Sequence, residues 1–275
     1  MDFSPKKELR KFLEEDIGKN DITGNLIKRK KICARIITRE NCVVAGTNFT
    51  KQIFSLKGSK TKTIKCDGSL AKPNQTIIKI IGLSQSILMC ERTALNLISR
   101  MSGIATETDK LVKEIKKSKS KSKLFATRKT APGLRFFDKE AVEIGGGKKH
   151  RMKLDSMVMI KDNHIAIHGS ISKLIKKAQK NHSEIEVEVE NEKDALLAAE
   201  LGVNIILLDN FTPKRIQRVI QRLEKHGLRK KVKLEASGRI NLKNIHSYAK
   251  TGVDMISVGS ITSSPKSIDM SLEIC

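Results

Sequence analysis

The sequence predicts an α/β protein that contains a parallel sheet, and three patterns indicate this fold class. Beyond residue 120, short apolar runs alternate with helical patterns at intervals of roughly 20 to 30 residues, which is typical of repeated βα units. Almost every one of these apolar runs ends in a polar side chain. Between residues 32 and 81, β-branched runs broken by Gly, Asn and Pro predict several strands of a second, open sheet.

Helices are predicted in three places in the first part of the chain. Apolar residues recur at helical spacing over residues 5–17, and a second helix is expected over 49–56. Residues 84–101 are the most helix-like segment and are mostly apolar. One face of that segment carries a polar stripe formed by Arg92, Asn96 and Arg100.

The repeating part of the chain divides into candidate strands and helices. The candidate strands are 123–127, 156–160, 185–190, 204–209, 232–236 and 254–258. Helical patterns lie near 136–144, 170–181, 192–201, 213–226 and 241–250. The polar groups at the strand ends are Arg128, Lys161, Glu188, Glu190, Asp209, Glu235, Ser237 and Gly259. In a βα barrel these ends converge on one mouth, so the pattern favours a barrel over an open sheet, and six or seven strands fit the length.

Three carboxylates alternate with apolar residues in the strand predicted over 185–190. They are Glu186, Glu188 and Glu190, which therefore share one face of the strand. Two interpretations remain open, a half-exposed edge strand and a strand whose acids face the barrel lumen. In the lumen the acids would repel one another and have raised pKa values unless cations or a metal lie nearby.

Cations are concentrated in residues 126–164, among Pro, Gly and short apolar runs. They are Arg128, Lys129, Arg135, Lys148, Lys149, His150, Arg151, Lys153 and Lys161. A solvated helix would instead interleave Lys with Glu. Arginine suits carboxylate or phosphate because its guanidinium fork binds such groups in bidentate fashion. The segment therefore predicts an anion site; ordinary surface cations are the alternative.

Motifs along nearly the whole chain resemble the quinolinate phosphoribosyltransferase family. The segments that carry the resemblance are EDIGKNDIT, ERTALNLISRMSGIAT, TRKTAPGLR, GGGKKHRM, MIKDNH, EVEVEN, LLDN, LEASG and ISVGSIT, in this order. The resemblance implies an N-terminal α/β sandwich over residues 1–105 and an incomplete six- or seven-stranded parallel α/β barrel over 106–263. Residues 264–275 are expected to pack back on the sandwich.

The resemblance implies transfer of phosphoribosyl from phosphoribosyl pyrophosphate to quinolinate, with loss of carbon dioxide, in NAD biosynthesis. Residues implied to bind quinolinate are Arg128, His150, Arg151, Lys161 and, from a partner subunit, Arg92. Those implied to bind phosphoribosyl pyrophosphate are Lys129, Glu188, Asp209, Ser237, Gly238 and Gly259. Lys129, Lys161, Glu188 and Asp209 are the expected catalytic residues. Mg²⁺ is expected to enter with the pyrophosphate, and a homodimer or larger homo-oligomer with shared sites is expected.

Three positions depart from the family pattern. Arg239 stands where relatives have glycine, Lys153 replaces a glycine after HRM, and Asn74 replaces the glycine of a Pro-Gly turn. None of these departures removes a charged residue that the mechanism needs. Loop geometry is what they place in question.

Composition limits the other functions. The net charge of +24 raises affinity for polyanions, but a chain with no Trp and one Tyr lacks the stacking platforms of single-strand binders, so we expect no nucleic-acid partner. The five cysteines form no C-x-x-C pair, and no apolar stretch is long enough to cross a membrane, so a cytoplasmic protein is expected.

Several alternatives remain open. They are transfer to nicotinate on the same fold, a relative associated with molybdate transport, a Schiff-base aldolase that uses Lys161, a basic nucleic-acid binder, and a zinc site at His164 and His168.

Overall fold

The computed structural model describes residues 3–275, which form two compact units. The first unit contains the chain up to Asp109 together with 131–145 and 264–275, and the second contains 110–130 and 146–263. The boundary predicted between residues 105 and 106 falls inside one continuous helix, α3 (Ser84–Lys117).

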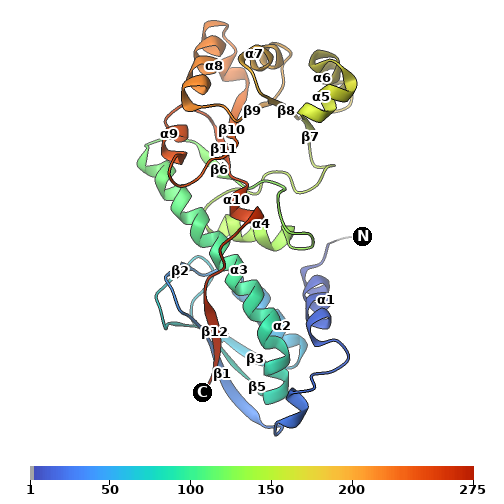
Figure 1. Ribbon diagram of the computed structural model, residues 1–275, viewed down its shortest axis with the longest axis vertical. Coiled ribbons are helices and arrows are strands. Elements are labelled where there is room, and N and C mark those ends of the chain that lie inside the picture. Colours follow the sequence, from blue (N-terminus) through green and yellow to red (C-terminus); the bar gives the residue numbers. More distant parts are fainter. Residues whose placement is uncertain (1–2) are drawn as a thin grey trace. The chain divides into compact units, whose positions relative to one another are not determined.

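The first unit is built on a four-stranded sheet with the order β12-β1-β5-β3. Its strands are β1 (Lys31–Thr38), β3 (Lys60–Thr63), β5 (Thr76–Leu83) and β12 (Met270–Ile274). All pairings are antiparallel, and β12 lies beside β1, with Ala34 opposite Ile274 (Figure 1). The end of the chain therefore completes a sheet that begins near residue 31. A short antiparallel pair, β2 (Cys42–Val43) with β4 (Leu70–Ala71), lies in the same unit.

The predicted N-terminal helices are present. They are α1 (Pro5–Ile17), α2 (Thr47–Leu56) and α3, with a 3-10 turn at Gly24–Leu26. Pro5 stands in the first turn of α1, where its missing N–H costs nothing. α3 runs well past Met101, where the sequence predicted its end. Gly103 does not terminate the helix. It is a packing position, because a Cβ there would collide with the backbone of Lys266.

Helix α4 (Arg135–Ile144) belongs to the first unit, although its residues lie inside the range predicted for the barrel. The fully buried Asp138 accepts two hydrogen bonds from Arg100, at 2.8 and 2.9 Å. Phe137 packs edge-on against Phe49, with ring centroids 5.0 Å apart. These contacts hold α4 to the helices of the first unit. The alternation of strand and helix patterns in the sequence does not reveal them.

The second unit is a six-stranded parallel sheet with the order β6-β11-β10-β9-β8-β7. Its strands are β6 (Lys123–Phe125), β7 (Val158–Ile160), β8 (Ile185–Val189), β9 (Ile205–Asp209), β10 (Lys233–Ser237) and β11 (Met255–Ser257). β6 and β7 are the two edges, so the sheet is an incomplete barrel. The predicted fold class is confirmed, with six strands as the count.

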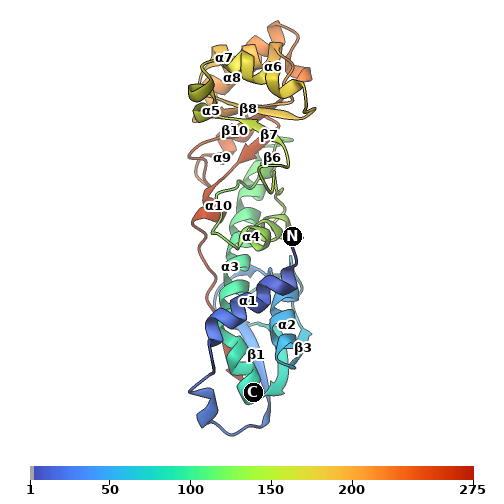
Figure 2. The same ribbon diagram turned by 90° about the vertical axis from the view of Figure 1, so that its right-hand side faces the viewer.

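Helices follow the strands of the second unit. They are α5 (Asp162–His168), α6 (Ile171–Gln179), α7 (Glu192–Glu200), α8 (Pro213–Lys225), α9 (Ile245–Ala249) and α10 (Ser260–Ser263), with a 3-10 turn at Arg229–Lys231. α6, α7 and α8 lie on the same side of β7, β8 and β10 (Figure 2). Their apolar faces bury Ile175, Ala198 and Leu223 against the sheet. The other side of the sheet therefore remains available for the side chains of the functional site.

The strand register places the polar side chains near the strand ends on one side of the sheet. Ser237 of β10 is opposite Asp209 of β9, and Glu188 of β8 is opposite Leu207 of β9. Since aligned residues of parallel strands point to the same side, these side chains converge. Among residues 3–275, no helix is both long and apolar enough to cross a membrane.

Candidate active site

A cavity of about 210 Å³ lies at the carboxyl ends of the strands in the second unit. Its walls include eight of the predicted site residues, namely Arg128, Lys129, His150, Arg151, Lys161, Glu188, Asp209 and Ser237. The loops that follow β6 and the Gly-rich turn supply the arginines, while β8, β9 and β10 supply the acids and the serine. The convergence expected of a βα barrel is therefore present.

Arg128 follows β6 and contributes an incompletely satisfied cation. Its Nε is buried and makes no hydrogen bond to any group in residues 3–275. A buried guanidinium donor without an acceptor is costly to leave unpaired. An anion in the cavity would supply the missing acceptor.

Arg151 lies beside Arg128 in the cavity wall. Its Nη1 donates to the carbonyl of Met157 at 3.4 Å, and its Nη2 lies 3.0 Å from the sulfur of Met159. Burial, and then the charge of Arg128, lower the pKa of Arg151. The two arginine cations repel each other, and a ligand with two negative charges would relieve this repulsion.

Lys161 follows β7, and its ammonium forms an ion pair with the carboxylate of Glu188. An ion-paired ammonium is not the free amine that a Schiff base requires. The same pair neutralises the charge of one of the two acids of β8. Its neighbour Glu190 is exposed at the strand end and does not line the cavity.

Asp209 ends β9 at the mouth of the cavity, and the next residue holds it. Asn210 donates from Nδ2 to Asp209 Oδ2 at 2.6 Å, and its backbone N–H donates to the carbonyl of Ser237 at 2.9 Å. Gly238 makes this approach possible, because a Cβ there would lie 2.3 Å from Asn210 Oδ1. Gly238 also has a φ of +97°, which favours glycine.

The helix predicted near 241–250 is wrong in its starting position. α9 begins at Ile245 and has five residues. The intervening turn is closed by the side chains of Asn241 and Asn244, whose amides donate to the carbonyl of Arg239 at 3.4 and 3.2 Å. Local side-chain hydrogen bonds of Asn compete with helix formation here.

Lys129 and Gly259 lie together at the other edge of the cavity. A Cβ at Gly259 would lie 3.3 Å from Lys129 Cδ, and Thr262 donates to the carbonyl of Lys129 at 2.8 Å. Gly259 is therefore a close-approach position for the lysine stem. Neither Gly238 nor Gly259 is in the cavity wall itself.

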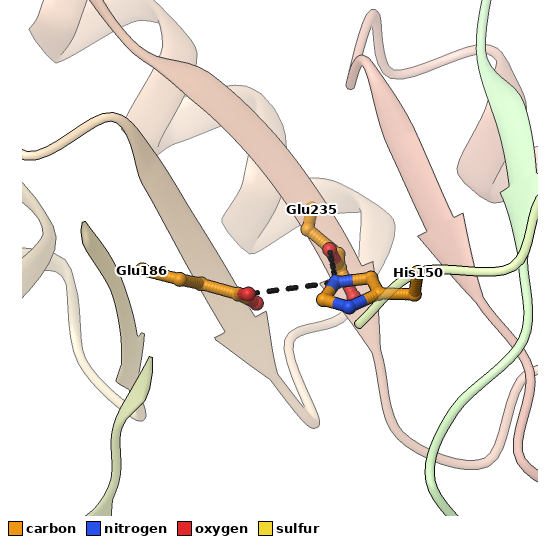
Figure 3. Close-up of side chains that lie close together, drawn as sticks. All are labelled: His150, Glu186 and Glu235. Carbon is orange, nitrogen blue, oxygen red and sulfur yellow. Dashed lines mark hydrogen bonds and ion pairs between the residues drawn. The ribbon is translucent and has the colours of Figure 1, made fainter. Parts of the chain in front are cut away.

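His150 is turned towards buried carboxylates (Figure 3). Its Nε2 lies 3.1 Å from Glu235 Oε2 and 3.4 Å from Glu186 Oε2, and its side chain is only 7% exposed. Burial, and then the neighbouring Glu235, raise the pKa of Glu186 to about 9. The raised pKa expected of an acid in the lumen is thus found at Glu186.

Arg92 lies in the first unit, on the exposed face of α3. It lines a groove of about 790 Å³ together with Asp16, Asn96 and Arg100. The polar stripe predicted from the sequence is therefore split in role, since Arg100 pairs with buried Asp138 while Arg92 and Asn96 stay exposed. The second unit's cavity does not include Arg92.

At two of the three positions that depart from the family pattern, the backbone has the conformation that glycine favours. Arg239 and Asn74 have φ values of 52° and 65°, in the left-handed region where glycine is unstrained. Lys153 is exposed in a bend. The His164 and His168 pair carries no metal cluster, because the one such cluster within residues 3–275 consists of His150, Glu186 and Glu235.

Several residues of the cavity and of the cluster below it were not assigned roles from the sequence. Glu235 was noted only as a strand-end acid, and Ser257, which donates to its Oε1, gave no signal beyond its place near the end of a strand. Glu186 was one of three alternating acids. The alternation of acidic and apolar residues could have marked Glu186 as a candidate for the barrel lumen. Only the register of β8 against β9 and the fold of the loop that carries His150 show that Glu186 is fully buried.

The fold and the cavity together define a class of enzyme. An incomplete parallel α/β barrel carries two arginines, two lysines and three carboxylates at its strand ends. Cations suit an anionic substrate, and carboxylates suit a transition state that gains positive charge. This is an enzyme that acts on small, multiply charged anions.

Comparison with known proteins identifies the family. The model of the quinolinate phosphoribosyl transferase C-terminal domain matches residues 104–273, and that of the N-terminal domain matches residues 21–102. The chain belongs to the quinolinate phosphoribosyl transferase family.

Individual relatives match over nearly the full length. The probable nicotinate-nucleotide pyrophosphorylase (carboxylating) of Methanothermobacter thermautotrophicus is 43% identical, with 97% of each chain covered. The protein of the same name from Methanocaldococcus jannaschii is 44% identical, covering 98% of this chain and 96% of that one. The crystal structure of the nicotinate-nucleotide pyrophosphorylase from Ehrlichia chaffeensis is 38% identical, covers 100% of both chains and has a TM-score of 0.93.

Proposed function

We propose that this protein is a nicotinate-nucleotide pyrophosphorylase (carboxylating). It transfers phosphoribosyl from phosphoribosyl pyrophosphate to quinolinate and releases carbon dioxide, in the synthesis of NAD. The observation that carries the proposal is the pair of arginines in the cavity, of which Arg128 has a buried Nε without an acceptor. Quinolinate brings two carboxylates for these two guanidinium groups. The names of the relatives support this reaction over a Schiff-base aldolase and a nucleic-acid binder.

The basic residues of the cavity bind the carboxylates of the substrate, and the acidic residues stabilise the sugar in the transition state. Arg128 and Arg151 bind the carboxylates, and Lys161, held by Glu188, adds a third cation beside them. The ring nitrogen attacks C1 of the ribose, the C1–O bond to pyrophosphate breaks, and the carboxylates of Glu188 and Asp209 stabilise the positive charge that develops on the sugar. Lys129 bridges the two substrates.

The second half of the reaction is loss of carbon dioxide. After the transfer the ring nitrogen is positively charged, so the electron pair left at C2 when the carboxylate departs is stabilised by the pyridinium. The carbon then takes up one proton. The remaining carboxylate stays paired with an arginine, which keeps the product oriented until pyrophosphate leaves.

Phosphate and metal fit the opposite edge of the cavity. Ser237 lines the cavity, and Gly238 and Gly259 lie beside its wall, so the Ser237 hydroxyl and the backbone N–H groups of the two glycines are the groups that we assign to the phosphate. Mg²⁺ would enter with the pyrophosphate and neutralise its charge. Of the three cavity carboxylates, Glu188 is paired with Lys161 and Glu235 is buried, so Asp209, a hard oxygen donor, is the protein group that would face the ion.

The deciding experiment supplies purified protein with phosphoribosyl pyrophosphate, Mg²⁺ and either quinolinate or nicotinate. We expect mononucleotide and carbon dioxide in equal amounts from quinolinate, and no product from nicotinate. Product from nicotinate alone would assign the protein to transfer without decarboxylation. No product from either substrate would contradict the proposed function. The predicted cytoplasmic location stays a prediction.

We also propose that Arg92 completes the site of a neighbouring subunit in a homodimer or larger assembly. Its support is that Arg92 is exposed and lines a groove of the first unit. The chains Arg92→Ala and Arg151→Ala should each be inactive alone. Mixed and reassembled, they should regain up to about half of the sites per hybrid dimer, since one site then has both arginines. A mixture that stays inactive would contradict the shared site.

A further inference from the structure

The turn that carries His150 and Arg151 is held by two buried carboxylates, Glu186 and Glu235, which lie against the His150 ring. His150 has a left-handed backbone, with a φ of 52°, which is strained for a residue with a side chain. Its ring is nearly buried and stands edge-on to Phe125, with centroids 5.8 Å apart. Such a conformation persists only where surrounding contacts hold it.

The hydrogen bonds of the ring fix which nitrogen carries the proton. The backbone N–H of Arg151 donates to His150 Nδ1 at 2.7 Å, so Nδ1 is the acceptor and the proton lies on Nε2. Nε2 then donates to Glu235 Oε2 at 3.1 Å. Ser257 donates to the other oxygen of the same carboxylate. Glu235 therefore accepts on both oxygens, as an ionised carboxylate does.

Glu186 has the opposite character. It is completely buried, and neither of its oxygens makes a hydrogen bond within residues 3–275. Two buried carboxylates this close to one imidazole cannot both be ionised without a large repulsion. Since Glu235 has two donors and Glu186 has none, Glu235 holds the charge and Glu186 holds a proton. The raised pKa of Glu186 agrees with this division.

A metal ion does not fit the same three side chains. A histidine bound to metal through Nε2 donates its other N–H to an acceptor. Here Nδ1 faces a donor, the N–H of Arg151, and cannot carry a proton. The cluster is therefore a hydrogen-bonded support.

We propose that Glu235 is a positioning residue for quinolinate binding, which acts by holding His150 and, through it, the backbone of Arg151. This rests on the proposed function. It gives His150 a second role, the support of the arginine, beside the contact with quinolinate that was predicted from the sequence. The ionised Glu235 carries the effect, and the neutral Glu186 fills the lumen beside it.

Two isosteric variants separate the two acids. Glu235→Gln removes the charge that holds His150, so KM for quinolinate should rise roughly tenfold or more, with kcat and KM for phosphoribosyl pyrophosphate within about threefold. Glu186→Gln replaces a neutral acid by a neutral amide, so it should change KM for quinolinate by less than about threefold. Glu186 does not line the cavity.

A double-mutant cycle tests the route through the imidazole. His150→Gln should raise KM for quinolinate as Glu235→Gln does, and the double variant should be no worse than the worse single variant, because both remove one support. If Glu235→Gln fails to fold, Ser257→Ala serves in its place. It removes one donor to Glu235 and should raise KM for quinolinate about threefold.

The outcomes distinguish this inference from the proposed function. A wild-type protein with no quinolinate activity contradicts the function itself. With an active wild type, the inference is overturned if folded Glu235→Gln keeps its KM for quinolinate, if Glu186→Gln loses as much as Glu235→Gln, or if the losses at His150 and Glu235 simply add.

Discussion

Replacing Glu186 by glutamine should stabilise the folded protein at neutral and alkaline pH. The carboxyl of Glu186 is fully buried, and burial together with Glu235 raises its pKa from 4.5 to about 9. An unfolded chain releases this proton near pH 4.5, whereas the folded chain keeps it until about pH 9. Between these values folding takes up a proton, so the free energy of unfolding falls as pH rises, by about 1.4 kcal/mol per pH unit.

The size of the effect follows from the distance to the lower pKa. From pH 4.5 to pH 7 the wild-type protein loses about 3 kcal/mol of stability through this one group. Glutamine has no proton to take up, so Glu186→Gln should be more stable at pH 7 by up to that amount, or roughly 5 to 10 °C in Tm. At pH 5 the two proteins should differ by less than about 1 kcal/mol. The charged and titratable groups that act on Glu186 are Glu235, Arg151, Lys161 and Glu188, with the His150 ring in contact.

The assay is thermal or urea denaturation of both proteins at pH 5, 6, 7 and 8. Glu190→Gln is the matched control, because Glu190 follows the same strand and is exposed. Its pH dependence should equal that of the wild type. Parallel curves for wild type and Glu186→Gln, or a variant that is less stable at pH 8 than at pH 5 relative to wild type, would refute the protonated state of Glu186.

Three further predictions concern the cavity and its loops. Arg128→Lys keeps the charge but removes the guanidinium fork and its buried Nε, so KM for quinolinate should rise roughly tenfold; an unchanged KM would remove Arg128 from the binding of a carboxylate. Gly238→Ala places a Cβ 2.3 Å from Asn210 Oδ1, so KM for phosphoribosyl pyrophosphate should rise at least tenfold while KM for quinolinate changes little, and equal losses for both substrates would point to general misfolding. Arg239→Gly relieves a left-handed arginine, so Tm should rise by roughly 2 °C, corresponding to about 1 kcal/mol; a lower Tm would mean that the arginine makes a compensating contact.

The order of the elements along the chain and eight residues of the cavity wall were predicted from the sequence. Apolar runs of three to five residues with polar ends predicted β6 to β11, because a buried parallel strand needs a continuous apolar run and exposes only its end. Arg128 and Lys161 were predicted to meet on the same grounds, since each follows a strand. Local patterns are sufficient here because the barrel brings all carboxyl ends to one mouth.

The tertiary structure decided what each side chain faces. Glu186, Glu188 and Glu190 look alike in the sequence, but one is buried and protonated, one is paired with Lys161, and one is exposed. The difference arises from depth along β8, which is set by pairing with β9 and by the loop that carries His150. Charge state depends on burial and on neighbours from distant parts of the chain, and these exist only after folding.

The same reason separates the helices that were placed well from those that were not. α8 (Pro213–Lys225) is strongly amphipathic, and local N-caps start α7 (Glu192–Glu200) and α8 at Asn191 and Thr212, so the sequence located both helices within a few residues. The end of α3, the unit to which α4 belongs and the late start of α9 depend on packing against Lys266, on the Arg100–Asp138 pair and on side-chain bonds to Arg239. Caps and periodicity act within a few residues and can be read from the chain. The contacts of α3 and α4 join distant segments that only the folded protein brings together, whereas α9 starts late because of local Asn hydrogen bonds that the periodicity does not show.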